Sequence, residues 1–185
     1  MSYTLYDASI GQAKDALKAL NKVFVRAKAC ENAANIPAAR LAEDMLPFTF
    51  QVHSCTMVAS KMASRLMGQD VIDYQPADLT DFASMEARLA TVQKQLDAVD
   101  KDTVNGRGGE IVGVGLGPGN PEAKVQAWQY VHGYGMPNIY FHLMTAYSIV
   151  RKEGGQLGKF DYLMPFMQEF IGDQLPEELK KKLNA

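Results

Sequence analysis

The sequence predicts an all-α protein of the four-helix-bundle class, and three observations lead to this prediction. Four segments carry apolar residues at steps of three and four, the period of an amphipathic helix. Of the 185 residues, 47% are hydrophobic, which is enough for a core without disulfides or a structural metal. Glycines gather between the third and fourth segments, as expected for an irregular crossover insert within a bundle.

The first helix is predicted from Ser9 to about Asn32, because its apolar residues fall on one stripe. These residues are Ile10, Ala13, Leu17, Leu20, Phe24 and Ala27. The turn residues and proline of Asn35-Ile36-Pro37 close the segment. A short helical turn is expected from Ala39 to Asp44.

The second helix is predicted over Phe48–Met67, with Gly68 as a left-handed stop. Gln69–Leu79 contains three aspartates and a proline and is expected to be a crossing loop. Thr80 is expected to cap the third helix, which has the most regular apolar stripe of the chain. Its members are Phe82, Met85, Leu89, Val92, Leu96 and Val99.

The segment Asp100–Pro121 holds seven of the fifteen glycines and is predicted not to be helical. The apolar residues Ile111, Val112 and Val114 favour a short ribbon or hairpin arm within it. The run Gly113–Gly119 resembles a phosphate-binding loop, but no Gly-Lys-Ser/Thr ends it and no strand follows it. A flexible crossover is therefore the preferred interpretation of the glycine-rich segment 106–119.

A fourth helix is predicted over Pro121–Arg151, with a kink or break near Gly133–Pro137 because proline removes one backbone hydrogen bond. One or two short helices are expected in the tail 161–183, split by Pro176. The predicted organisation is a bundle over residues 1–163 and a C-terminal helical extension, residues 164–185, that packs on the same domain.

Composition excludes several function classes. The formal charge of −2 gives no basic excess for binding nucleic acid, and no apolar run approaches the roughly 20 residues of a membrane span. The N-terminal residues carry no secretory signal pattern, so a cytoplasmic location is expected. Cys30 and Cys55 form no C-x-x-C pair, which fits reduced thiols.

Candidate chemistry centres on the three histidines, His53, His132 and His142. Asn138 precedes His142 by four residues, so both side chains are expected on one face of the fourth helix. Packing of the second helix against this face would bring His53 opposite them. The resulting cluster is compatible with a metal site, an acid–base pair or a hydrogen-bonded knot in the core.

The metal interpretation has the weakest chemical basis of the three. Zinc and iron need three or more competent ligands, and asparagine is a weak one. His132 and His142 lie about 15 Å apart along a regular helix, so they cannot share one ion.

Aromatic residues are dense around this segment: Trp128, Tyr130, Tyr134, Tyr140, Phe141 and Tyr147. In the functional interpretation, tyrosine hydroxyls and His142 line a concavity where the bent helix opens the bundle. In the structural interpretation, the same polar tips bond to backbone groups freed by Pro137. The sequence leaves both open.

Three segments resemble a known family: Leu41–Phe48 followed by Gln51-Val52, the stretch Pro137–Tyr147 with its Pro-Asn-x-Tyr-Phe-His motif, and Leu157–Leu163. They are similar to the bacterial and fungal branch of the DinB/YfiT-like bundles catalogued as a domain of unknown function, DUF1993. The resemblance extends from about Tyr3 to Leu163.

The resemblance implies a DinB-like four-helix bundle, often dimeric, whose better-known relatives hold a divalent metal on three histidines and include thiol-dependent transferases. His53 and His142 match two of those positions, and Asn138 stands where the relatives have the third histidine. The candidate metal set that the resemblance implies is therefore His53, Asn138 and His142, with zinc, nickel or iron as the candidate ion.

The leading hypothesis is a protein that binds or transforms a small organic molecule in a pocket near the bend. His142 and His53 are the candidate catalytic residues, and Asn138, Tyr140, Tyr147 and His132 the candidate ligand-binding residues. No cofactor is favoured. The alternatives are a metal-dependent thiol-transferase-like enzyme and a non-catalytic homodimeric structural protein; a homodimer without nucleic-acid or membrane partners is expected.

Overall fold

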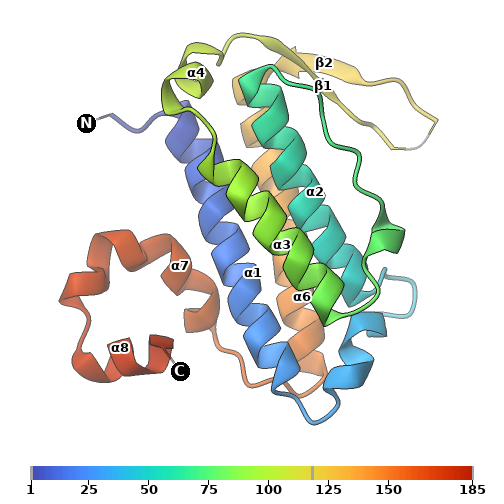
Figure 1. Cartoon of the computed structure of the whole chain (residues 1–185), viewed down its shortest axis with the longest axis vertical. Coiled ribbons are helices and arrows are strands. Elements are labelled where there is room, and N and C mark those ends of the chain that lie inside the picture. The colour runs from blue at the N-terminus through green and yellow to red at the C-terminus, as the bar shows by residue number, and fades with distance from the viewer. Residues whose placement is uncertain (1, 118, 185) are drawn as a thin grey trace.

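The computed structural model of the chain describes residues 2–117 and 119–184. Four long helices lie side by side: α1 (Gln12–Lys28), α2 (Phe48–Met67), α3 (Phe82–Asp97) and α6 (Met136–Lys152) (Figure 1). The only sheet among the described residues has two strands. The all-α class and the four-helix bundle predicted from the sequence are confirmed.

Helices α1 and α6 run in the same direction. The Tyr140 hydroxyl of α6 donates to Gln12 Oε1 near the start of α1, at 2.7 Å. Just past the opposite ends of the two helices, Asn32 Nδ2 donates to Glu153 Oε2 at 2.8 Å. Both ends of this pair are therefore fixed by polar contacts.

Helices α2 and α3 are also parallel to each other. The rings of Phe48 and Phe82, one at the start of each helix, have centroids 6.3 Å apart. Between three and four turns later, Ser60 Oγ donates to Gln95 Oε1 at 2.6 Å. Parallel neighbours need a connection that returns along the bundle, and the segment 68–81 provides it, as the sequence predicts. Gly68 begins this segment with φ of 69° in the left-handed region.

The core consists of the apolar stripes of the four helices. Phe24, Phe48 and Phe82 meet at one end in edge-on or tilted contacts of 5.8 to 6.4 Å and join α1, α2 and α3. Within residues 2–117 and 119–184, no helix has both the length and the apolar character of a membrane span.

The N-terminal region differs from the sequence prediction in two places. The first helix ends at Lys28 rather than near Asn32, and a π-helical turn, η1 (Asp7–Gly11), precedes it. The short helix that follows is the 3-10 helix η2 (Ala33–Ala38), not a turn at Ala39–Asp44. Pro37 lies inside η2. In so short a 3-10 helix few residues donate a backbone hydrogen bond, so the N–H that proline lacks costs little.

The cap of α3 is Asp81 and not the predicted Thr80. The Asp81 carboxylate accepts a hydrogen bond from Ser84 N at 2.8 Å, and Ser84 Oγ accepts from Asp81 N at 3.1 Å. This reciprocal pair satisfies two backbone donors at the start of the helix.

The prediction that Asp100–Pro121 is not helical is wrong for its first residues. Helix α4 spans Lys101–Gly106, capped by the Asp100 carboxylate, which accepts from Thr103 N at 2.8 Å. The prediction relied on the glycine content of the whole segment, but most of these glycines lie after α4. The Asp100 cap is therefore enough to start a short helix before them.

Residues after α4 form the hairpin that the apolar positions indicated. Strand β1 (Ile111–Val114) pairs antiparallel with β2 (Ala123–Gln126). Residues 121–126 were expected to be helical, but residues 123–126 pair with β1 as a strand, so the fourth helix starts later. It begins with α5 (Ala127–Tyr130) instead of Pro121.

The predicted kink or break near Gly133–Pro137 takes a different form. The π-helical turn η4 (Val131–Gly135) connects α5 to α6 without a gap, and Pro137 lies in the first turn of α6. A π turn is wider than an α turn and moves the carbonyl four residues back away from the proline ring. Gly135 packs tightly here, since a Cβ would lie 3.0 Å from Met62 Sδ of α2 and Met62 would have to shift to make room for it.

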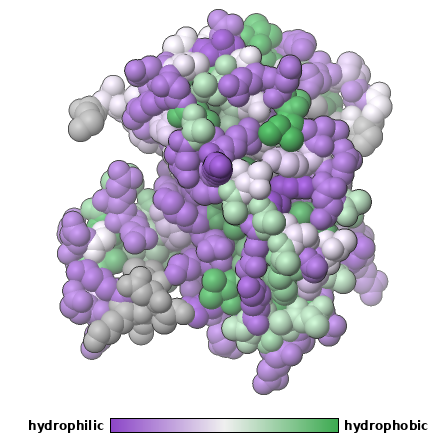
Figure 2. Space-filling view, in the orientation of Figure 1, coloured by the Kyte–Doolittle hydropathy of each residue, from purple (hydrophilic) through white to green (hydrophobic). Residues whose placement is uncertain are grey.

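The C-terminal residues form α7 (Lys159–Ile171), the short η5 (Gly172–Gln174) and α8 (Glu177–Asn184). Arg26 of α1 contacts the Asp161 carboxylate at 3.4 Å, so the start of α7 lies on α1. The predicted domain boundary at 163/164 falls within α7. Figure 2 shows an indentation of the surface between the N-terminal end of the bundle and this C-terminal arm.

The Asp81 cap allows a direct test of the α3 boundary. Asp81→Ala is expected to lower the free energy of unfolding by about 1 kcal/mol, because the backbone N–H of Ser84 loses its acceptor. Thr80→Ala is the control and is expected to change it by less than about 0.5 kcal/mol. Urea denaturation measures both, and equal losses would contradict the assignment of Asp81 as the cap.

Candidate functional site

The closest polar contact between α2 and α6 joins Gln51 to His142. Helix α6 runs antiparallel to α2, because Cys55 Sγ, one turn after Gln51, donates to Ile139 O, about one turn before His142, at 3.5 Å. Gln51 Oε1 and His142 Nδ1 are 2.7 Å apart. The two helices therefore hold an imidazole and a carboxamide against each other near the start of α2.

The Gln51 amide determines the tautomer of His142. Gln51 Nε2 donates to the carbonyl of Leu46 at 2.8 Å, so its Oε1 is the atom that faces the imidazole. An amide oxygen only accepts, and Nδ1 of His142 must therefore carry the proton. The lone pair of His142 Nε2 is left available, and this nitrogen is not among the buried polar atoms that lack a partner.

His53 lies two residues after Gln51 on α2 and is 3% exposed. Its Nδ1 is buried and makes no hydrogen bond within the described part of the chain. Such atoms are rare in folded proteins and mark a bound water, a ligand or a functional group. The polar side chains deeper along α2, such as Thr56 and Ser60, have partners at 2.6 to 3.0 Å.

The ring of Phe50 lies near both imidazoles. Its centroid is 5.8 Å from that of His53 and 6.2 Å from that of His142. Phe141 stands edge-on to His142 at 5.2 Å. Aromatic rings on two sides reduce the solvation of the imidazoles, and this has a direct electrostatic consequence.

Both imidazoles are neutral at pH 7. Burial, with a smaller effect of His53, lowers the pKa of His142 to about 4. Burial also lowers the pKa of His53, and the positive charges of Arg88 and Lys61 act in the same direction. Two neutral imidazoles offer lone pairs and N–H groups for hydrogen bonding rather than positive charge.

Asn138 is one turn before His142 on α6 and is half-buried. No described hydrogen bond involves its side chain. The structure thus brings His53 and His142 to one face, with Asn138 on the same stripe of α6.

The remaining predicted ligand-binding residues lie elsewhere. Tyr140 points toward α1 and α7, where it bonds Gln12 and meets the ring of Phe166 at 6.0 Å. Tyr147 is half-buried against the core. His132 is exposed in the π turn. The candidate residues expected around one concavity therefore lie apart, with His142 toward α2 and Tyr140 toward α1 and α7.

Three residues of this region were not identified from the sequence. Gln51 sets the His142 tautomer, and Phe50 shields both rings. Arg88 of α3 is 8% exposed, bonds Asp78 at 2.7 Å and stacks on Tyr74 at 3.9 Å. A charged residue at a position on the buried stripe of α3 was the one available signal for Arg88, since charges there need a partner.

The residues present do not fit a three-imidazole metal centre. His53 and His142 supply two nitrogen donors, and the third position offers only the Asn138 carboxamide, a poor ligand for zinc, nickel or iron. In the described residues, no three His, Cys, Asp or Glu side chains gather closely enough to hold an ion.

The parallel pairs α1/α6 and α2/α3, joined through the antiparallel contact of α2 with α6, define the class of the protein as an all-helical four-helix bundle. A solved structure of a DinB family member protein from Shewanella denitrificans is similar, with a TM-score of 0.75 and 27% identity; the match covers 86% of this chain and 91% of that one. The chain matches the family described as "Domain of unknown function (DUF1993)" over residues 5–163 and belongs to it. No curated protein matches the chain.

The low pKa of His142 predicts how stability depends on pH. The unfolded imidazole titrates near 6.5 and the folded one at about 4, so the unfolded state takes up more protons between these values. The free energy of unfolding should fall as the pH drops from 6.5 to 4, by an amount on the order of 2 kcal/mol after allowance for partial solvation. Denaturation curves at constant ionic strength measure this, and a similar slope in His142→Gln would contradict it.

The missing third imidazole predicts a gain of function. Asn138→His creates two histidines one turn apart on α6, facing His53 of α2. Zinc content of protein purified without a histidine tag should rise from far below one ion per chain to near one. Asn138→Gln is the matched control and should bind none. Near-stoichiometric metal in the unsubstituted protein would contradict the assessment that its residues do not fit a metal.

Proposed function

We propose that this protein binds a small organic molecule at the paired imidazoles of His53 and His142. The observation that carries the proposal is the pair itself: a neutral His142 with a fixed tautomer and a free Nε2, next to a buried His53 whose Nδ1 has no partner. The buried Nδ1 of His53 is costly to leave without a partner, and a bound molecule that reaches both imidazoles would supply one.

The protonation state limits what the ligand can be. A neutral imidazole held by Gln51 presents an acceptor at Nε2, so the complementary ligand group is a donor: a hydroxyl, a thiol or an amine N–H. Phe50 and Phe141 provide apolar contacts for the body of such a molecule.

Binding is favoured over acid–base catalysis in the unliganded protein. A general acid or base works best when its pKa is near the working pH, and the pKa of His142 is about 4. At pH 7 the ring carries no proton to donate at Nε2 and is a weak base. A reaction would require a ligand that raises this pKa, for instance through a negatively charged group near the ring.

The test is a thermal-shift screen with alcohols, thiols and amines of metabolite size. At about 100 times its Kd, a ligand adds about 2.7 kcal/mol of stability, which is roughly 5–10 °C for a chain of this length. His142→Gln and His53→Gln should each abolish the shift. Tyr147→Phe, which removes one hydroxyl away from the imidazole pair, is the control and should retain it.

The outcome separates the proposal from the alternatives of the sequence analysis. A shift that survives both histidine substitutions would contradict the proposed site. A shift that needs added zinc, nickel or iron would favour a metal-dependent enzyme. The homodimer and the cytoplasmic location remain predictions of the sequence.

A further inference from the structure

A hollow lies on the side of α6 away from α2, between the N-terminal residues and the fourth helix. Its volume is about 680 Å³, and its walls include Tyr3, Gln12, Trp128, His132, Pro137 and Tyr140. We call it the aromatic notch. The π turns η1 and η4 flank it, since Ala8 and Val131 also line it. Tyr140 faces this notch and His142 faces α2, so the notch is separate from the paired imidazoles.

The polar edges of the notch rings are already satisfied. Trp128 is 48% exposed, and its indole Nε1 donates to Gln126 Oε1 at 2.8 Å. The Tyr140 hydroxyl donates to Gln12 Oε1. These bonds hold the two side chains in position and leave ring surface, rather than polar groups, for a ligand.

The protein uses cation–π contacts at other tyrosines but not here. Lys14 and Lys101 lie over the ring of Tyr6, Arg65 over Tyr130 and Arg88 over Tyr74, at 3.9 to 5.9 Å from the centroids. Over the described part of the chain, no lysine or arginine makes such a contact with Tyr3, Trp128 or Tyr140. The notch rings are therefore free to receive a cation from outside.

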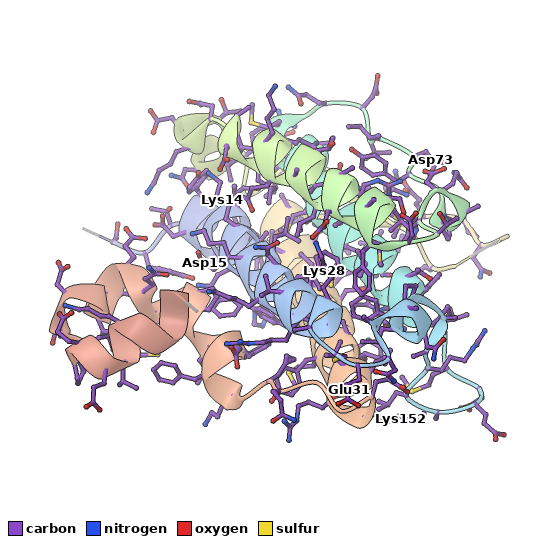
Figure 3. All side chains as sticks on the ribbon, turned by 60° about the horizontal axis from the view of Figure 1, so that its bottom comes forward. Lys14, Asp15, Lys28, Glu31, Asp73 and Lys152 are labelled. Carbon is purple, nitrogen blue, oxygen red and sulfur yellow. The ribbon has the colours of Figure 1, made fainter. Side chains whose placement is uncertain are left out.

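Carboxylates adjoin the aromatic notch. A smaller hollow of about 340 Å³ shares Tyr3 and Gln12 with it and is lined by Asp7, Asp15 and Glu169. Figure 3 shows Asp15 on the side of α1 that faces the C-terminal arm, and the indentation in Figure 2 lies in the same region.

Lysines offset part of this negative charge. Lys101 pairs with Asp7 and Lys18 with Asp15, at 2.9 and 2.8 Å. Among the described side chains, Glu169 forms no ion pair.

The tyrosine hydroxyls respond to these carboxylates. Burial and then the Asp7 charge raise the pKa of Tyr3. Burial raises the pKa of Tyr140 to about 12, with smaller contributions from Tyr162, Tyr3 and Asp15. Negative charge near the rings disfavours a phenolate, and the same field attracts a cation.

We propose that the aromatic notch binds an organic ammonium ion, with its methyl or methylene groups against Tyr3, Trp128 and Tyr140 and its charge toward the carboxylates of the adjoining hollow. Ring faces attract cations through their quadrupole, and alkylated ammonium ions lose little hydration when they enter such a site. A carboxylate or phosphate ligand would be repelled by Glu169, whose charge no described lysine or arginine offsets, since Asp7 and Asp15 are paired with Lys101 and Lys18.

Trp128 is the only tryptophan of the chain, so its fluorescence reports on this notch alone. Choline is the probe, and its neutral isostere 3,3-dimethyl-1-butanol is the matched ligand control. Choline should change the Trp128 emission in a saturable way, with a Kd at least tenfold below that of the neutral isostere. Its Kd should rise with ionic strength because screening weakens the attraction.

Two protein variants locate the effect. Tyr3→Ala removes one wall from a side chain that is 71% exposed and should raise the choline Kd at least fivefold with the fold intact. Phe160→Ala, which removes an exposed ring of α7 that lines neither hollow, should leave it unchanged. Equal affinity for choline and for the isostere would overturn the proposal. So would the absence of a saturable change in emission up to about 50 mM choline. Binding in His142→Gln should equal that of the unsubstituted protein, so this result stands apart from the test of the paired imidazoles.

Discussion

The antiparallel contact between α2 and α6 is the constraint on which the rest of the structure depends. Gly135 packs closely on α2 at one end of the contact, where a Cβ would lie 3.0 Å from Met62 Sδ. At the other end of the contact, Gln51 and His142 form a 2.7 Å hydrogen bond. Close packing at one end and a polar clamp at the other fix the rotation of α6, and that rotation decides which of its side chains face α2 and which face α1.

Close packing of α2 buries several of its polar side chains. Most of them have a hydrogen-bond partner in the protein, and one does not. Cys55 bonds a carbonyl of α6, and Ser60 and Ser64 share the Gln95 side chain of α3. Each of these groups exchanges water for a protein partner, which makes its burial acceptable. His53 departs from this pattern, with a buried nitrogen that has no partner. The departure coincides with the lowered pKa values of His53 and His142, and their combination sets this region apart from an ordinary core.

Two faces of the fourth helix have different surroundings, although the sequence analysis assigned their polar residues to one concavity. Its residues 138 and 142 lie on the side of α2, while Tyr140 lies on the side of α1 and α7. A period of 3.6 residues separates positions two apart by about 200° around the helix, so His142 and Tyr140 cannot line the same concavity. The π turn η4 absorbs Pro137 without opening the bundle, and the predicted bend therefore creates no single pocket. Two distinct surfaces result, one with imidazoles and one with exposed aromatic rings.

The sequence by itself determined the helical class, the bounds of α2 and the pairing of His53 with His142 on facing helices. Apolar periodicity, Gly68 and a four-residue spacing are local signals, and local backbone sterics suffice to interpret them. Only the tertiary structure decided the role of Gln51, the unpartnered Nδ1 of His53 and the separation of Tyr140 from His142. Those features depend on how one helix is rotated and shifted against another, and the packing of side chains distant in sequence sets that rotation. The same reason explains the late start of the fourth helix, since residues 123–126 become a strand only when residues 111–114 lie beside them.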